Sequence, residues 1–191
     1  MTAVSLVDVV VKVGGALLAH PIQLDGVLAA LADAATARRL LIVPGGGPFA
    51  DAVRDVDRRF ALTDDAAHWM AVLAMDQYAH LLASRLNVAA LAWNPTDITA
   101  ALERRRLPVL APSRWLREAD PLPHSWDVTS DSIAAWVAGA VGAARLVLVK
   151  PPGARAEAVD AYFYRGLPPD VGPPEIVPAD QIATLRRRLT V

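Results

Sequence analysis

The chain of 191 residues contains no cysteine, which excludes a disulfide scaffold, a thiolate zinc site and a cysteine nucleophile. Aromatic residues are also scarce, at 6%, although 54% of the residues are hydrophobic; this composition is typical of helices packed on buried strands. An excess of one charge is lacking as well, because the net charge is -1. We therefore expect no attraction to nucleic acid or to anionic membranes.

Long hydrophobic runs are missing too. The longest apolar stretch, residues 133–144, is too short to cross a bilayer, and the first residues do not have the pattern of a signal peptide. The sequence thus predicts a cytoplasmic protein without a membrane span.

Lysine is nearly absent, since only Lys12 and Lys150 stand beside 17 arginines. A coding preference for arginine explains this imbalance wherever any positive charge suffices. Arginine cannot replace lysine where a compact, movable ammonium group is needed. Both lysines are therefore candidates for a functional role.

Aliphatic runs alternate with segments of helical periodicity along the chain. Strands are expected at residues 7–13, 40–43, 88–92, 108–111, 145–150 and 175–177. Helices are expected at residues 24–35, 48–60, 64–86, 96–105, 113–118, 130–141 and 179–189. This alternation predicts an α/β fold in one domain, a three-layer αβα sandwich with a mostly parallel central sheet.

On the helix at residues 64–86, we expect a core-facing stripe of Met70, Leu73, Ala74 and Leu81.

Three expected strands end in residues suited to binding anions. The first has Lys12 next to its last residue and is followed by Gly14 and Gly15, the second is followed by the glycines at 45–47, and the fifth ends at Lys150. Ligands bind beyond the carboxyl ends of parallel strands, and right-handed crossovers place these ends at one edge. Glycine lets backbone N–H groups approach phosphate oxygens, and ammonium groups offset their charge. The combination predicts a phosphoryl-transfer site, although each piece alone is equally typical of a turn or a solvated side chain.

A second candidate segment precedes the helix at residues 130–141. Thr129, Ser130 and Asp131 can cap this helix, and Asp131 can also hold both lysines in their charged form. Asp127 is not needed for the cap and is free to meet a substrate. Arg54 either is solvated or reaches back toward the glycines.

Other polar side chains give weaker signals. Asp76 and Gln77 are unusual on an apolar helix and are minor candidates for the site. The four histidines lack metal-ligand spacing, so we expect no metal site built from protein side chains. There is no Ser/His/Asp motif context and no G-x-x-x-x-G-K-[ST] loop.

Three ordered motifs resemble the amino acid kinase superfamily, which includes acetylglutamate, aspartate, uridylate and isopentenyl phosphate kinases. They are VKVGG at residues 11–15, IVPGGGP at 42–48 and TSDSIAA at 129–135. Each motif is weak alone, but their order and spacing are also similar. The resemblance covers roughly residues 7–150.

Within this superfamily, three segments are most similar to the kinases of methanofuran-type cofactor synthesis. They are AHWMA at residues 67–71, AMDQY at 74–78 and WDVTSD at 126–131. Members of this branch phosphorylate [5-(aminomethyl)furan-3-yl]methyl phosphate to the diphosphate.

The resemblance implies roles for individual residues, and it implies ATP as donor. Mg²⁺ is expected from the phosphate chemistry. Lys12 would bind the transferred phosphoryl group, Asp131 would organise the lysines, and Gly14 and Gly15 would bind ATP phosphates together with Lys150. The acceptor would meet Gly45, Gly46, Gly47, Asp127 and Thr129. Arg54 is a further candidate for the acceptor because of its position after these glycines, apart from the resemblance. Asp127 could pair with the acceptor's amine. Most members have their second essential lysine further along the chain, whereas none follows Lys150 here, so Lys150 is only a candidate for that role.

The resemblance also implies a small phosphorylated substrate, a homo-oligomer, and two lobes: residues 1–125 for the acceptor and 126–191 for the nucleotide. Two alternatives stay open. One is another kinase of the same fold, acting on isopentenyl phosphate, uridylate or N-acetylglutamate. The other is a non-catalytic sensor of nucleotides or anions. A Rossmann-type dinucleotide binder is disfavoured, because no G-x-G-x-x-G follows the first strand.

Overall fold

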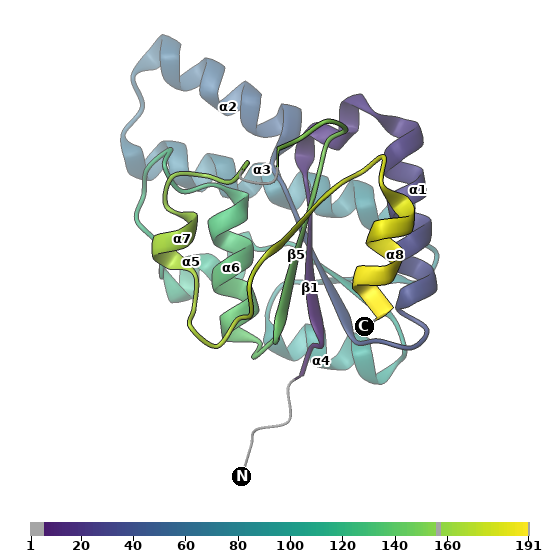
Figure 1. The fold of residues 1–191 in the computed structure, drawn as a ribbon. Helices are drawn as coiled ribbons and strands as arrows, with labels where there is room; N and C mark the ends of the chain where they lie inside the picture. The colour runs from purple at the N-terminus through teal and green to yellow at the C-terminus, as the bar shows by residue number, and fades with distance from the viewer. Residues whose placement is uncertain (1–5, 156–157, 191) are drawn as a thin grey trace.

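The computed structural model describes residues 6–155 and 158–190, and its centre is a six-stranded parallel sheet (Figure 1). The strand order is β3-β4-β2-β1-β5-β6, and every recorded strand pair is parallel. The strands are β1 (Val9–Val13), β2 (Leu40–Pro44), β3 (Ala89–Ala92), β4 (Leu107–Leu110), β5 (Arg145–Lys150) and β6 (Glu175–Pro178). The predicted αβα sandwich with a parallel sheet is therefore confirmed.

Helices cover both faces of this sheet. They are the 3₁₀ helix η1 (Gly15–Ala19) and the α-helices α1 (Pro21–Ala34), α2 (Gly47–Phe60), α3 (Asp64–Ser84), α4 (Pro95–Glu103), α5 (Ser113–Ala119), α6 (Ser130–Ala140), α7 (Phe163–Gly166) and α8 (Ile182–Thr190). In Figure 1, α1 and α8 lie together on one side of the sheet, and α6 and α7 lie on the other. No helix in the described part of the chain combines the length and apolar composition needed to cross a membrane.

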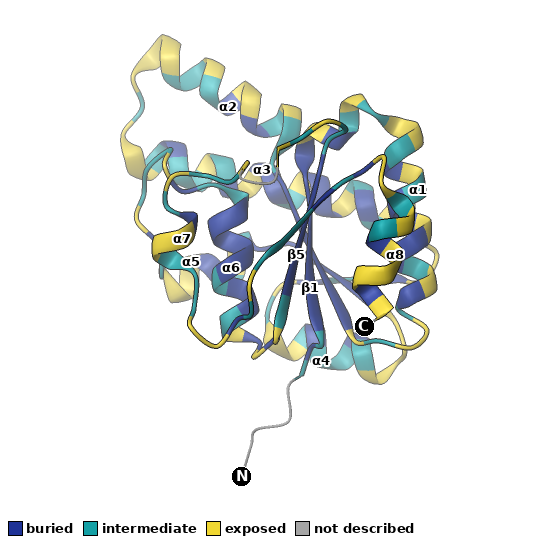
Figure 2. Cartoon of the chain, viewed as in Figure 1, coloured by how far each residue is buried: buried dark blue, intermediate teal, exposed yellow. Residues whose placement is uncertain are grey.

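The apolar core forms two clusters, one on each face of the sheet. Side chains alternate along β1, so Val9, Val11 and Val13 belong to the cluster beneath α1 and α8, whereas Val10 belongs to the cluster beneath α6. Figure 2 shows the central strands buried along their length. Burial on both faces explains why these strands are nearly continuous runs of aliphatic residues.

The predicted core stripe of α3 is wrong at two positions. Met70 and Leu73 are 36% and 49% exposed, whereas Val72, Met75 and Leu82 are buried. The helix packs against α2 as well as against strands of the sheet, so its buried face is set by two neighbours. Helical periodicity alone does not reveal which neighbours a helix has.

Strand register brings the predicted site residues to one edge of the sheet. Val13 of β1 lies opposite Pro44 of β2 and Val149 of β5. The turn after β1, the turn after β2 and Lys150 therefore lie together beyond the carboxyl ends of neighbouring strands. Because β1 pairs with β5, one sheet runs through both predicted lobes.

Candidate active site

The two lysines of the chain meet at a single buried carboxylate. Asp131 lies on the first turn of α6, and its Oδ1 is 2.9 Å from Lys12 Nζ while its Oδ2 accepts a hydrogen bond of 2.5 Å from Lys150 Nζ. Among the residues that the structure describes, Lys12 contacts Oδ1 as an ion pair. Lys12, Asp131 and Lys150 are 5%, 4% and 9% exposed. A cluster of two cations and one anion thus lies almost out of solvent.

The charges of this cluster are mutually dependent. Burial raises the pKa of Asp131, but the ammonium groups of Lys12 and Lys150 outweigh it and hold that pKa below its ordinary value. Burial lowers the pKa of Lys150, and the like charge of Lys12 lowers it further, while Asp131 offsets part of this effect. The carboxylate is ionised at neutral pH, and the positive charge around it exceeds its own.

The glycine turns after β1 and β2 touch each other beside this cluster. Gly14 N–H donates to Val149 O at 2.9 Å, and Gly45 N–H donates to Val13 O at 2.8 Å, which tie the turns to neighbouring strands. A Cβ on Gly15 would lie 2.0 Å from the backbone nitrogen of Gly47, so no larger residue fits there. Gly47 also has a φ of +54°, in the region that favours glycine. Close backbone packing explains the need for glycine at these positions.

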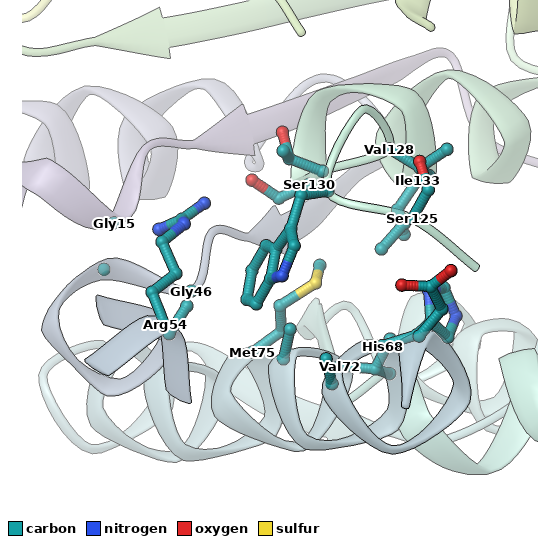
Figure 3. A pocket seen from close by; sticks show the side chains of 17 residues that line it. Gly15, Gly46, Arg54, His68, Val72, Met75, Ser125, Val128, Ser130 and Ile133 are labelled. Atoms are coloured by element: carbon teal, nitrogen blue, oxygen red, sulfur yellow. The ribbon is translucent and has the colours of Figure 1, made fainter. Parts of the chain in front are cut away.

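A cavity of about 130 Å³ opens next to the glycine turns, between the α2–α3 pair and the start of α6 (Figure 3). Its lining residues are Gly15, Gly46, Gly47, Ala50, Arg54, Asp64, Ala67, His68, Ala71, Val72, Met75, Ser125, Trp126, Val128, Thr129, Ser130 and Ile133. Most are apolar or small, while Arg54 lies at one end, His68 at the other, and Ser130 between them. Such a cavity suits a small molecule with an apolar body.

Arg54 lies at the glycine end of the cavity. Figure 3 shows its side chain beside Gly15 and Gly46. The guanidinium forms an ion pair of 2.8 Å with Asp51 and stacks 4.7 Å from the centre of the Trp126 ring. The sequence left open whether Arg54 is solvated or reaches back toward the glycines. In the structure its side chain lies beside the glycines and lines the cavity.

Three comparisons with known proteins bear on this arrangement. A model of the amino acid kinase family matches residues 9–151, which include both glycine turns, Asp131 and both lysines. The chain belongs to the amino acid kinase family. This family model covers more than half of the chain.

Relatives of the family agree with this assignment. The [5-(aminomethyl)furan-3-yl]methyl phosphate kinase of Methanocaldococcus jannaschii is 31% identical over 132 residues, which is 67% of this chain but only 58% of that relative. A uridylate kinase from Archaeoglobus fulgidus has a TM-score of 0.72 at 13% identity and covers 95% of both chains. A UMP kinase from Bacillus anthracis has a TM-score of 0.68 at 12% identity, with 95% of this chain and 91% of that chain covered. At such identities the solved structures show the fold alone.

Other predicted residues lie at different distances from this family site. Thr129 lines the cavity, whereas Asp127 is exposed and is not one of the lining residues. Asp76 accepts hydrogen bonds from the backbone and hydroxyl of Ser113 and so caps α5, and Gln77 is exposed. Neither Asp76 nor Gln77 lines the cavity.

The predicted capping of α6 by the side chains of Thr129, Ser130 and Asp131 is wrong. Thr129 occupies the N-cap position, but Asp160 accepts the hydrogen bonds from the backbone N–H and hydroxyl of both Thr129 and Ser132. This remote carboxylate holds the turn that carries Asp131. Asp160 belongs to no motif and lies in a segment without regular periodicity, so the sequence gives no signal for it.

Two further residues of the site were missed. Tyr78 is fully buried on α3, and its hydroxyl donates a hydrogen bond of 3.4 Å to Gly14 O, which supports the first glycine turn. His68 lines the cavity and stacks on His124, with ring centres 4.1 Å apart. Both lie in the segments that carry the narrower family resemblance. In the described ranges, no group of three or more His, Cys, Asp or Glu side chains is arranged to hold a metal.

Proposed function

We propose that this protein transfers the terminal phosphoryl group of ATP to the phosphate of a small phosphorylated acceptor. The observation that supports this most is the buried carboxylate of Asp131 between the ammonium groups of Lys12 and Lys150, next to two glycine turns. Phosphoryl transfer needs in-line positioning and neutralisation of developing charge, rather than covalent help from the protein. Two fixed ammonium groups and the N–H groups of the turns supply both.

The donor side is assigned to Gly14, Gly15 and Lys150. The N–H group of Gly15 suits the phosphates of ATP, whereas that of Gly14 already donates to Val149 O, so Gly14 contributes close backbone approach instead. Lys150 neutralises charge on the oxygen that leaves. The charged groups here fit anions rather than a free metal ion, because both oxygens of Asp131 already face ammonium groups. Mg²⁺ would therefore be held mainly by the phosphates of the nucleotide. Bound ATP with its metal supplies the phosphoryl group that is transferred.

The acceptor side is assigned to the turn of Gly45, Gly46 and Gly47, with Arg54 and Thr129 at the cavity. A phosphate monoester at this turn would present its oxygen toward Lys12, while Arg54 binds the remaining oxygens. The apolar middle of the cavity fits a ring such as furan. Since the curated relative is named for its action on [5-(aminomethyl)furan-3-yl]methyl phosphate, we propose that compound as the acceptor.

The decisive experiment is a screen for acceptor-dependent formation of ADP. Purified protein, ATP and Mg²⁺ are incubated with single phosphate monoesters: the aminomethylfuran compound, isopentenyl phosphate and UMP, with N-acetylglutamate as a carboxylate acceptor. We expect the furan diphosphate as product, identified by mass spectrometry. Turnover of another acceptor alone would assign the protein to a different kinase of this fold. ATP binding without any turnover would favour a sensor.

Replacing Arg54 with Gln tests the acceptor side. We expect KM for the acceptor to rise about tenfold, while kcat and KM for ATP change little, because a charge-assisted contact to the phosphate is lost. Steady-state kinetics with each substrate varied in turn measure this. Arg58→Gln is the matched control, since Arg58 lies one turn further along α2, outside the cavity lining, and pairs with Asp55. Equal losses in both variants would contradict the role of Arg54.

The lowered pKa of Lys150 predicts an alkaline limit to activity. The proposed role of Lys150 requires its charged form, so kcat/KM should fall as pH rises, with an apparent pKa below 10.5. In Lys150→Arg, residual activity should lose this limb, because a guanidinium stays charged. The effect of Lys150 on stability runs in the opposite direction. Because the pKa of Lys150 is lower in the folded protein than in the unfolded chain, the free energy of unfolding increases as pH rises between these two pKa values.

The proposal also includes the two lobes and an oligomer. Residues 1–125 would bind the acceptor and 126–191 the nucleotide, with Asp131 and the β1–β5 pairing joining them. The exposed side chains of Met70 and Leu73 on α3 supply apolar surface for a homo-oligomer. Sedimentation equilibrium measures this state directly.

A further inference from the structure

One face of α3 runs along the cavity and ends in a carboxylate. Asp64, Ala67, His68, Ala71, Val72 and Met75 all line the cavity, and their spacing is that of one helical face. Asp64 begins this helix, and it is the one carboxylate among the residues that line the cavity in the described part of the chain. From Asp64 to Met75 the helix rises about 16 Å, at about 1.5 Å per residue.

The two ends of the cavity differ in charge. Figure 3 shows Arg54 with Gly15 and Gly46 at one end, and His68 with Ser125 at the other, with Met75 between them. Asp64 lies one turn before His68 on the same helix face. The glycine end is therefore cationic and rich in N–H groups, whereas the outer end holds a carboxylate and an imidazole.

The imidazole of His68 is held in place and uncharged. Burial lowers its pKa to about 4, with a further contribution from the like charge of His124, so it is neutral at pH 7. His124 stacks on it at an interplanar angle of 15° and is itself held 2.9 Å from both Asp65 and Asp120. In residues 6–155 and 158–190, no hydrogen-bond partner of the His68 ring is recorded. A neutral imidazole has a free acceptor nitrogen that can serve a ligand.

We propose that this outer end is a subsite for a protonated amine on the acceptor, with Asp64 as its counter-charge and His68 as a hydrogen-bond acceptor. The inference rests on the proposed function, which places the acceptor's phosphate at the glycine end. An acceptor with a phosphate at one end and an ammonium group at the other is then complementary in charge to the cavity. Its phosphate meets the cationic glycine end, and its ammonium group meets the carboxylate at the outer end. This assigns the amine to Asp64 instead of Asp127, because both carboxylates are exposed but only Asp64 lines the cavity.

The test compares two ligands that differ only in the amine. The probes are [5-(aminomethyl)furan-3-yl]methyl phosphate and its 5-methyl analogue, and isothermal titration calorimetry measures the binding of each to the purified protein. The wild-type protein should prefer the amine by about tenfold, the size of one charge-assisted hydrogen bond. Asp64→Asn should remove most of this preference while leaving the binding of the methyl analogue unchanged, and Asp64→Glu should restore part of it.

Asp55→Asn is the control. Asp55 is an exposed carboxylate on α2 that pairs with Arg58 and does not line the cavity, so its loss removes the same charge outside the proposed subsite. The ligand preference of this variant should equal that of the wild type. Preference lost in both variants would assign the effect to the general loss of a negative charge and overturn the subsite.

Other results separate this inference from the proposed function. Equal wild-type binding of both probes would overturn the subsite, whatever the activity. Loss of the preference in Asp127→Asn instead of Asp64→Asn would overturn it too. An amine preference that depends on Asp64, found in a protein that transfers no phosphoryl group, would support the subsite and contradict only the kinase assignment.

Discussion

The substitution Asp131→Asn is expected to lower kcat/KM by about 10²- to 10³-fold, because both ammonium groups lose the anion that positions them. It should also lower the free energy of unfolding by about 3–5 kcal/mol, since two buried cations are left without a counter-charge. Coupled-assay kinetics measure the first effect, and urea unfolding measures the second.

A triple variant separates the two effects. Lys12→Met, Asp131→Leu and Lys150→Met together remove the whole charge cluster and replace it with apolar side chains of similar size. Replacing buried ion pairs in this way is often neutral or stabilising. We therefore expect a folded protein without detectable phosphoryl transfer. Full activity in Asp131→Asn would contradict the positioning role of this carboxylate.

The second large effect is expected from Gly15→Ala. The new Cβ would lie 2.0 Å from Gly47 N and 2.4 Å from Gly47 Cα, and backbone atoms cannot yield as a flexible side chain does. The two glycine turns must separate, which we expect to destabilise the fold by about 3 kcal/mol and to lower kcat/KM more than 100-fold. Thermal unfolding and steady-state kinetics measure both.

Gly26→Ala is the matched control for this substitution. Gly26 lies within α1, where an added Cβ meets the tip of Ile182 at 3.3 Å. Alanine favours the helix over glycine by about 1 kcal/mol, which offsets the mild contact. We expect unchanged activity and a similar melting temperature. A Gly15→Ala protein with the melting temperature and kcat/KM of the wild type would show that close contact between the two glycine turns is not required.

Much of the site could be predicted because its signals are local. Lysine scarcity indicated Lys12 and Lys150, and glycine runs at strand ends indicated the edge of the sheet that is proposed to bind anions. The parallel sheet then placed these ends together. The structure adds the geometry: a single carboxylate on the first turn of α6 contacts both lysines.

Other features depend on which segments meet in space. Asp160 caps α6 from about 30 residues away, through a chain segment with no regular pattern. The choice between Asp64 and Asp127 depends on which of them lines the cavity, and sequence similarity to a family does not encode this. Likewise, Met70 and Leu73 are apolar residues on an apolar helix, and only the packing of α3 shows that they face outward.

The position of β1 between β2 and β5 has a consequence for synthesis on the ribosome. β1 can pair with β2 as soon as residue 44 has emerged, but its other edge waits for residues 145–150. During that interval, the unpaired N–H and C=O groups on this edge of the valine-rich β1 can form hydrogen bonds with other chains. Lys12 is the one charge in the VVVKV run, and until Asp131 arrives its ammonium group opposes such pairing. Lys12, which is proposed to hold the transferred phosphoryl group, thus also places a charge in this strand that is unfavourable for aggregation of the nascent chain.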